Sequence, residues 1–138
     1  MIIVDRPPNF EQIKAAFPKA ESDGVIFAFD GAIYNPSGKP IPPALIAHEE
    51  VHLTRQRRHM FMPPNSWWDY YLRDSEFRYN EELLAHAAEF KMQRVTDRNF
   101  VARLLMSTAM RLVAPLYNYT PPVSLQQAMN DLRREIAR

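Results

Sequence analysis

The alternation of apolar and polar positions divides the chain of 138 residues into a short β region followed by a longer helical region. Residues 25–29 (VIFAF) and 32–34 (AIY) are rich in β-branched and aromatic side chains. The Asp30-Gly31 pair between them is a strong type I′ turn signal, so the pattern predicts a β-hairpin. The apolar run IIVD at residues 2–5 predicts a further short strand.

Helical periodicity predicts helices over most of the remaining chain. A capping residue paired with an acidic or amide residue three positions later marks three helix starts: Asn9 with Gln12, Ser66 with Asp69, and Ser124 with Gln127. Pro18 ends the first of these helices. A proline pair suits the first turn of a helix through 44–59, and two more helices are expected at about 76–95 and 96–112. The expected fold class is α+β, a mostly helical single domain over residues 1–138 with a small N-terminal hairpin or sheet.

Two histidines four positions apart stand in the stretch LIAHEEVHLTRQ, with a glutamate directly after the first. On a helix, His48 and His52 point the same way about one turn apart, so both can ligate one zinc ion at roughly 2.0–2.1 Å. Glu49 lies about 100° around the helix, where it can accept a proton from water without ligating the metal. The alternative is an amphipathic helix with incidental histidines, but the H-E-x-x-H spacing favours a zinc site.

A third ligand is expected on a separate element, and the acidic segment SEFRYNEELLAHAAEF offers the best candidates. Four of its residues share one helical face: Glu82, Ala85, His86 and Glu89. The small side chain of Ala85 permits close packing against the helix of His48 and His52. Glu82 is therefore the expected third ligand. Glu81, rotated by about 100°, is a competing ligand that we expect to face solvent or a neighbouring loop.

H-E-x-x-H followed by E-x-x-A on the next long helix resembles the gluzincin class of zinc metallopeptidases. The segments IYNPSGKPIPPALIAHEEVHLTRQ and FRYNEELLAHAAEF are closer still to short metallopeptidases encoded by bacteriophages, a likeness that covers residues 25–90. The resemblance implies a minimal zincin-like fold, with His48, His52 and Glu82 as zinc ligands and Glu49 as catalytic base. One departure is His86, because many gluzincins carry at this position an aspartate that orients a ligand histidine.

Tyrosines in the segment PLYNYT are candidates for stabilising the oxyanion of a tetrahedral intermediate. Tyr117 is the preferred donor, His86 is its rival, and Tyr119 is a further possibility. The structural alternative is that aromatic residues in a proline-rich loop pack on the core. The predicted hairpin also offers an edge to which an extended substrate can add as a strand.

Two further groups of residues are expected to be structural. The first is an apolar stretch that can line a substrate pocket but more often forms core: Met60, Phe61, Met62, Trp67, Trp68, Tyr70 and Tyr71. The second is a basic helix end that we expect to be solvated: Arg55, Arg57 and Arg58.

Composition limits the types of metal ligand and the classes of binding partner that the chain can have. The chain has no cysteine, so a metal must be held by histidine and carboxylate. Lys plus Arg is 17 against 16 Asp plus Glu, a net charge of +1 that provides no global field for nucleic acid or anionic membranes. The start MIIVDRPPNF is not a secretory signal, and no apolar run is expected to cross a bilayer. The expected location is the cytoplasm, which is the host cytoplasm if a phage encodes the chain.

These features together predict a zinc-dependent metalloendopeptidase that acts on a peptide or protein substrate, with no nucleic-acid or membrane partner. One alternative is a zinc-stabilised structural or assembly module without turnover, within a virion for example. Another is a metal-sensing interaction protein. Glu49 favours the enzyme, because a structural site needs no base beside the metal, whereas a fourth protein ligand would favour the structural module.

Overall fold

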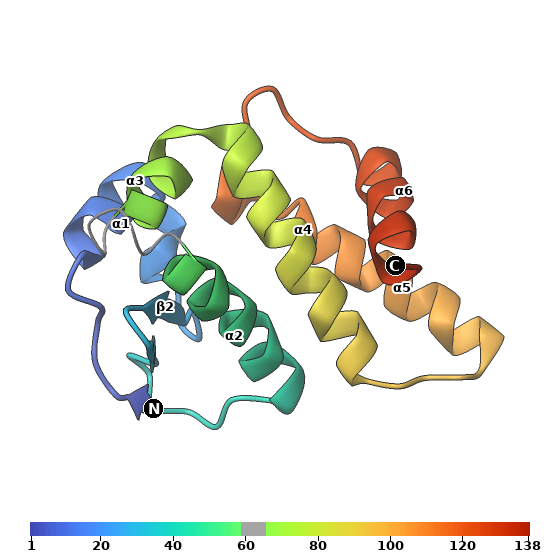
Figure 1. Cartoon of the computed structure of the whole chain (residues 1–138), viewed down its shortest axis with the longest axis horizontal. Helices are drawn as coiled ribbons and strands as arrows, with labels where there is room; N and C mark the ends of the chain where they lie inside the picture. Colours follow the sequence, from blue (N-terminus) through green and yellow to red (C-terminus); the bar gives the residue numbers. More distant parts are fainter. Residues whose placement is uncertain (59–65) are drawn as a thin grey trace.

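The computed structural model describes residues 1–58 and 66–138, and it is mostly helical with a small sheet near the N-terminus (Figure 1). The α+β class expected from the sequence is confirmed. The strands are β1 (Ile2–Ile3), β2 (Phe27–Phe29) and β3 (Ala32–Tyr34). The α-helices are α1 (Phe10–Ala16), α2 (Pro43–Arg58), α3 (Ser66–Arg73), α4 (Ser75–Met92), α5 (Arg98–Leu112) and α6 (Leu125–Ile136). Two short 3₁₀ helices are η1 (Pro18–Glu21) and η2 (Pro115–Tyr117).

The predicted hairpin is present as β2 and β3. Asp30 and Gly31 have φ angles of 44° and 82°, and positive φ at both central positions is what a type I′ turn requires. β3 is the central strand, paired antiparallel with β2 and parallel with β1, so the sheet order is β1-β3-β2. β2 therefore forms one edge of the sheet and lies against α2.

The helix caps agree with the sequence in part. Ser124 caps α6 as predicted, since its hydroxyl accepts a hydrogen bond from the Gln127 N–H at 3.1 Å. Asn9 is the N-cap residue of α1 as predicted, but the capping hydrogen bonds expected at Asn9 and Ser66 are absent, because both side chains are buried without a partner among the described residues. Asp74 and Asp97 instead cap α4 and α5 by accepting backbone N–H bonds at 3.0 and 2.9 Å.

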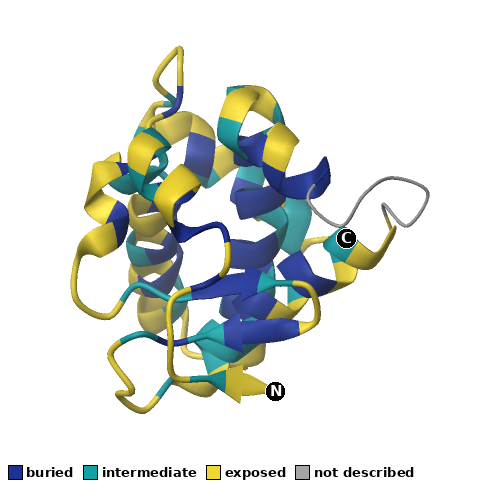
Figure 2. Ribbon diagram, turned by 90° about the vertical axis from the view of Figure 1, so that its left-hand side faces the viewer, coloured by how far each residue is buried: buried dark blue, intermediate teal, exposed yellow. Residues whose placement is uncertain are grey.

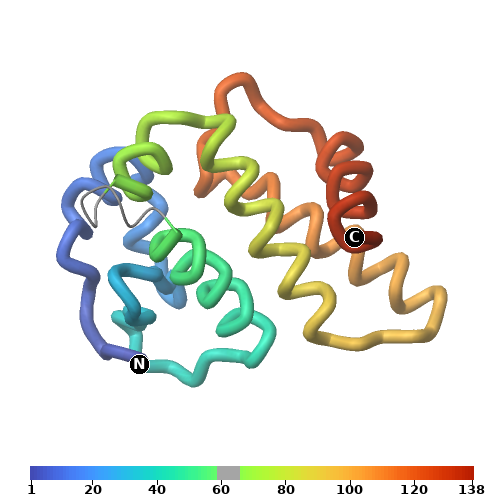
Figure 3. Tube along the Cα trace, viewed as in Figure 1, coloured from blue at the N-terminus to red at the C-terminus, as the bar shows by residue number. Residues whose placement is uncertain are grey.

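α4 lies between two hydrophobic cores (Figures 1 and 3). The N-terminal core joins α1, η1, β2 and α3 through Phe10, Ile13, Phe17, Ala20, Phe27, Trp67, Trp68 and Tyr71. The C-terminal core joins α4, α5, α6 and the segment after η2 through Tyr79, Ala87, Leu105, Ala109, Leu112, Tyr119, Ala128 and Leu132. Because α4 also packs along α2, it links the two halves. Buried positions accordingly line the inward faces of the helices and the sheet (Figure 2).

The α2–α4 contact differs from both cores because it buries ionisable side chains. Of the four buried residues on α2, only Leu53 is apolar, and the others are His48, Glu49 and His52. The face of α4 is similar, with Arg78, Glu81, Glu82, His86 and Glu89 all buried. Buried ionisable groups are costly unless they are paired or bind a metal, so this contact is where function is expected.

The expectation that no apolar run is long enough to cross a membrane needs correction. By length and composition alone, the 20 residues Arg98–Tyr117 pass that test, with a mean hydropathy of 1.2. A core helix of a soluble protein passes the same test, so the signal is weak. In the fold, α5 packs Leu105, Ala109 and Leu112 into the C-terminal core against α4 and α6.

Arg78 ties α4 to the segment that follows α5. Its guanidinium donates hydrogen bonds to the backbone carbonyls of Tyr71, Tyr117 and Asn118 at 2.7, 2.7 and 3.1 Å. The same group lies over the ring of Phe17, with its central carbon 4.9 Å from the ring centroid. One buried cation thus fixes η2 against α4 and the N-terminal core, and it places the side chain of Tyr117.

Candidate metal centre

The two histidines of α2 converge as their spacing predicts. The Nε2 atoms of His48 and His52 are 3.2 Å apart, and both side chains are buried. Helical geometry alone places the two rings one above the other. The packing of α4 adds the third group.

Glu82 is the residue of α4 that meets both histidines. Its Oε2 lies 3.2 Å from His48 Nε2, and its Oε1 lies 3.2 Å from His52 Nε2. Tyr71 of α3 donates a hydrogen bond from its hydroxyl to Glu82 Oε1 at 2.5 Å, which holds the carboxylate in place. The structure therefore brings together the three residues predicted as ligands. Ala85, fully buried, stands one turn further along α4 at this contact.

This arrangement suits a metal ion better than a hydrogen-bonded cluster. The two histidine nitrogens are 3.2 Å apart, and each lies 3.2 Å from a different oxygen of Glu82, close to the spacing of about 3.3 Å between tetrahedral ligands with bonds of 2.0–2.1 Å. Glu82 Oε2 makes no hydrogen bond within the described residues despite its proximity to His48, so the geometry is not that of donor and acceptor. A buried polar atom without a partner is costly, and a metal ion at the common point would remove that cost.

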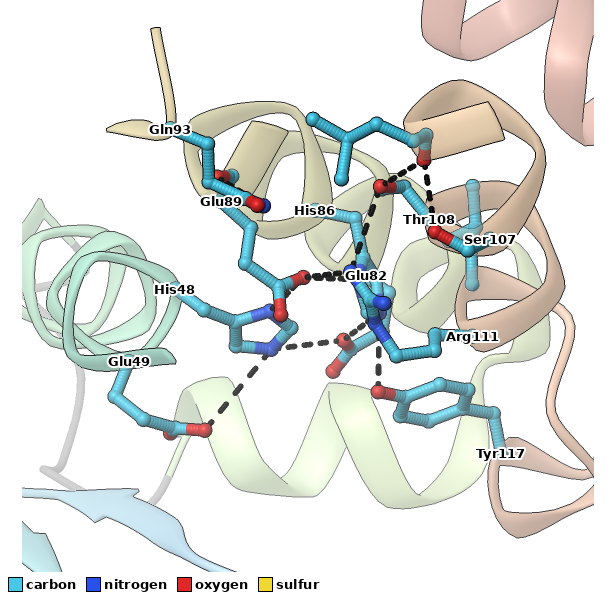
Figure 4. Close-up of polar contacts among 12 residues, drawn as sticks. His48, Glu49, Glu82, His86, Glu89, Gln93, Ser107, Thr108, Arg111 and Tyr117 are labelled. Carbon is cyan, nitrogen blue, oxygen red and sulfur yellow. Dashed lines mark hydrogen bonds and ion pairs between the residues drawn. The ribbon is translucent and has the colours of Figure 1, made fainter. Parts of the chain in front are cut away.

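Glu49 lies at the edge of this cluster, with its Oε1 4.0 Å from His48 Nε2 (Figure 4). It is buried and makes no hydrogen bond to any described residue. Burial raises the pKa of Glu49 above its usual value, although His48 and His52 oppose the shift. A carboxylate whose pKa is raised toward neutrality is well suited to accept and release protons.

The carboxylate of Glu81 pairs with Arg55 and not with the two histidines, and the expectation that it faces solvent or a loop is wrong. Its carboxylate is 1% exposed and accepts hydrogen bonds from Arg55 Nε and Arg55 NH2 at 2.9 to 3.2 Å. Arg55 follows His52 by three positions on α2, so the contact between the two helices extends one turn beyond the metal centre. Arg55 is thus not solvated as predicted, whereas Arg57 and Arg58 are exposed.

Glu89 faces the Nδ1 atoms of His86 and His48, the nitrogens that point away from Glu82. The sequence pattern did not reveal this position. Glu89 Oε2 lies 2.7 Å from His86 Nδ1, 3.6 Å from His48 Nδ1 and 3.6 Å from an Arg111 nitrogen (Figure 4). Carboxylates that face the outer nitrogen of a ligand histidine fix its tautomer and orientation. Glu89 Oε2 is beyond hydrogen-bond distance of His48 Nδ1, which has no partner among the described residues, but it is the carboxylate nearest this nitrogen. It thus stands where the resemblance places a residue that orients a ligand histidine, the role associated with position 86. The shared face with Glu82 was the available signal.

His86 and Tyr117 both reach the centre. His86 Nε2 lies 3.6 Å from Glu82 Oε2 and 3.2 Å from the Tyr117 hydroxyl. Burial lowers the pKa of His86, so the ring is neutral at pH 7. With its Nδ1 proton directed to Glu89, its Nε2 carries the lone pair and accepts from Tyr117. Neutral His86 in this tautomer is a possible metal ligand rather than an oxyanion donor.

The three groups His48, Glu82 and His86 also satisfy the spacing of a metal site, with one donor atom from each within 4.8 Å of the others. The two candidate sets share His48 and Glu82 and differ in their third member, His52 or His86. His48, His52 and Glu82 are mutually closer than His86 is to Glu82.

Of the remaining candidates, Tyr71 reaches the centre through its hydrogen bond to Glu82, and Tyr119 does not. Tyr119 is core, since its buried hydroxyl donates to the Leu112 carbonyl at 2.9 Å. Trp67, Trp68 and Tyr71 are buried as expected, Tyr70 is exposed, and Met60, Phe61 and Met62 lie outside the described residues.

The edge of β2 is less available to a substrate strand than expected. The Ala28 carbonyl already accepts hydrogen bonds from Gln56 Nε2 at 2.9 Å and from Trp68 Nε1 at 3.1 Å. The Asp30 N–H donates to Gln56 Oε1 at 3.1 Å. One side-chain amide thus takes the place that a neighbouring strand would occupy at this point of the edge.

No protein-family model, curated protein or solved structure matches the chain. The likeness to gluzincins therefore stays a prediction from the short motifs around His48 and Glu82. The function must be argued from the geometry of the centre.

Glu82 and Glu81 provide a matched pair of variants. Glu82→Gln should weaken zinc binding by more than about a hundredfold, because it removes a charged ligand. Glu81→Gln should leave the zinc Kd nearly unchanged but lower the free energy of unfolding by about 1–2 kcal/mol, because it weakens the partly exposed pair with Arg55. Competition with a chromophoric chelator and denaturant unfolding of the metal-free protein measure the two effects. Loss of zinc binding in Glu81→Gln would contradict the assignment.

Glu89→Gln should weaken zinc binding by about tenfold, because the neutral amide orients His48 and His86 less strongly than the carboxylate. The matched control is Glu76→Gln, which changes an exposed carboxylate on the same helix and should leave the Kd unaltered. Equal zinc affinity in both variants would show that Glu89 does not support the centre.

Zinc binding should release a proton. Burial disfavours the charged form of His48, but Glu82 and Glu89 outweigh this effect and raise its pKa to about 10 in the metal-free protein. A proton therefore competes with zinc below pH 10, and zinc affinity should rise about tenfold for each pH unit between 6 and 9. Calorimetry at pH 7.5 in buffers with different ionisation enthalpies should report roughly one proton released per zinc. Affinity independent of pH would argue against displacement from His48.

Proposed function

We propose that this protein is a zinc-dependent peptidase whose metal is held by His48, His52 and Glu82. The observation that carries the proposal is the convergence of these three side chains at 3.2 Å separations beside a buried carboxylate, Glu49. Two imidazoles and one carboxylate favour zinc over magnesium or calcium, which prefer oxygen donors throughout.

When bound, zinc would act as a Lewis acid that activates water and polarises the scissile carbonyl. The chain's own residues would transfer protons and hold the metal ligands in position. Glu49 would take a proton from the attacking water and deliver it to the leaving amine. Tyr71 and Glu89 would hold Glu82 and His48 in their positions, and water-poor surroundings would strengthen each interaction.

The environment of Glu49 supports an enzyme over a purely structural site. Three other buried carboxylates each have a close partner: Glu81 has Arg55, Glu82 has Tyr71, and Glu89 has His86. Within the described residues, Glu49 has only the His48 nitrogen at 4.0 Å. A buried carboxylate without a firm partner that lines a pocket beside the metal ligands favours a role in proton transfer.

A structural zinc module is the second candidate, and the position of His86 favours it. Four protein ligands close a zinc coordination sphere, whereas catalytic sites keep one position open. The lone pair on His86 Nε2, 3.6 Å from Glu82 Oε2, provides a possible fourth ligand. If His86 remains bonded to Tyr117 instead, the fourth position stays available to substrate.

The variant Glu49→Gln tests the role of the base independently of metal binding. The variant should retain about one zinc per chain and the wild-type Kd, because coordination is intact, but lose proteolysis by several orders of magnitude. The measurement is metal content together with cleavage of an unstructured protein such as denatured casein. Equal rates for the wild type and Glu49→Gln would rule out Glu49 as the base. Absence of cleavage by the wild type would favour the structural module.

His86→Ala decides between open and closed coordination. If the fourth position is open, zinc affinity should fall by about tenfold or less, whereas the His52→Ala control should abolish tight binding. The absorption spectrum of the cobalt-substituted protein should change little in His86→Ala. A loss of affinity as large as that in His52→Ala, with an altered cobalt spectrum, would identify His86 as a ligand and support the structural module.

A further inference from the structure

An open groove of about 530 Å³ lies between the start of α2, the end of α4 and Arg111 of α5. The two helices run in opposite directions, so Pro43 and Met92 lie at the same end of the molecule (Figure 1). Most of the lining is apolar, from Pro42, Pro43, Ala44, Leu45 and Met92. Among the described residues, none lines both this groove and the pocket that contains Glu49. The groove is therefore distinct from the candidate active site.

We propose that this groove binds an acidic segment of a partner protein, with a carboxylate of the partner on Arg111 and an apolar side chain against Leu45 and Met92. The inference goes beyond the proposed function, because it does not depend on catalysis at the metal centre. α2 and α4 carry both the groove and the predicted metal ligands, so a bound partner would lie against the two helices that form the centre.

Arg111 has donors available for a carboxylate at the groove. Its side chain is 46% exposed, and its Nη2 lies 3.6 Å from Glu89 Oε2 and 3.4 Å from Thr108 Oγ1 (Figure 4). Its other N–H groups make no hydrogen bond to any described residue. Glu89 lies beyond hydrogen-bond distance and is itself bonded to His86, so it does not saturate the guanidinium. The planar fork of an arginine binds a carboxylate through two parallel hydrogen bonds.

The charge around the groove is positive, unlike that of the rest of the chain. Residues 90–130 contain five basic residues and one acidic residue, Asp97, which caps α5. The remaining residues contain 12 basic and 15 acidic residues. The five basic side chains are all exposed: Lys91, Arg94, Arg98, Arg103 and Arg111. A local excess of this size attracts acidic partners, although the net charge of the whole chain is only +1.

Exposed apolar side chains gather in the same part of the chain. Met92, Phe100, Met106 and Met110 are 40–57% exposed, and they are half of the large hydrophobic residues that are exposed in the described chain. Met106 and Met110 are four positions apart on α5, on the side away from the buried Leu112. Methionine side chains adapt to different surfaces, so such a face is typical of protein binding. The partner should therefore combine acidic with apolar side chains.

A protein segment fits this surface better than a bilayer or a second copy of the chain. A bilayer cannot enter a groove, and the four exposed apolar residues include no tryptophan or tyrosine, which membrane interfaces favour. Two copies joined through this surface would bring two sets of five cations together, and these would repel. Four of the five cations are arginines, which suit the geometry of carboxylates better than lysines do.

A fluorescently labelled peptide of about twelve residues, with leucine and glutamate at helical spacing, tests the groove in the full chain. It should bind at least about tenfold more tightly than an analogue with glutamine in place of each glutamate, because hydrogen bonds to charged groups are stronger. Arg111→Gln should weaken binding by about tenfold. The matched control Arg57→Gln, at an exposed position near the other end of α2, should not. Fluorescence anisotropy measures each Kd.

Met92→Glu tests the groove without altering the Glu89–Arg111 pair. It adds a negative charge at an exposed position of the lining, so the acidic peptide should bind at least about tenfold more weakly, while the zinc Kd and the circular dichroism spectrum stay unchanged. Equal binding of the two peptides, or undiminished binding by Arg111→Gln and Met92→Glu, would overturn the proposal. No binding of the acidic peptide at about millimolar concentration would do the same. Tighter binding of phosphatidylglycerol vesicles than of the peptide would overturn it in favour of a membrane surface.

Discussion

The structure depends on one contact, in which α2 and α4 pack together through buried ionisable side chains. His48, Glu49 and His52 of α2 are withdrawn from water, and they face Glu82 on α4. Such an interface is stable only if charges are balanced by protons, by partners or by a metal ion. The contact that joins the two halves of the molecule is therefore the same contact that forms the candidate centre.

Support for this contact comes from elements that are distant in sequence. Tyr71 of α3 bonds Glu82, Arg111 of α5 lies near Glu89, and Arg78 anchors η2 so that Tyr117 reaches His86. Ligands held by several packed elements lose little entropy on binding a metal, which favours tight and geometrically selective coordination.

The buried carboxylates show how one residue type serves different purposes in one interface. Glu81 pairs with Arg55 and holds the helices together, whereas Glu82 points its oxygens at two histidines. Glu89 bonds Nδ1 of His86 and lies near Nδ1 of His48, and Glu49 is close to the ligands without a firm partner. The partner of each carboxylate thus distinguishes a structural role from a chemical one. The neutral ring of His86 suits either an open or a closed centre, because its Nε2 can keep the hydrogen bond from Tyr117 or bind the metal instead.

The sequence by itself determined the local features of this protein. The Asp30-Gly31 turn, the i, i+4 spacing of His48 and His52, and the placement of Glu82 on the face of Ala85 all follow from turn chemistry and helical period. Only the tertiary structure decided which side chains of separate helices meet. Periodicity orients residues relative to their own helix axis, but not relative to a neighbouring helix. The partner of Glu81, the position of Glu89 near His48 and the bond from Tyr71 to Glu82 depend on how α2, α3 and α4 pack.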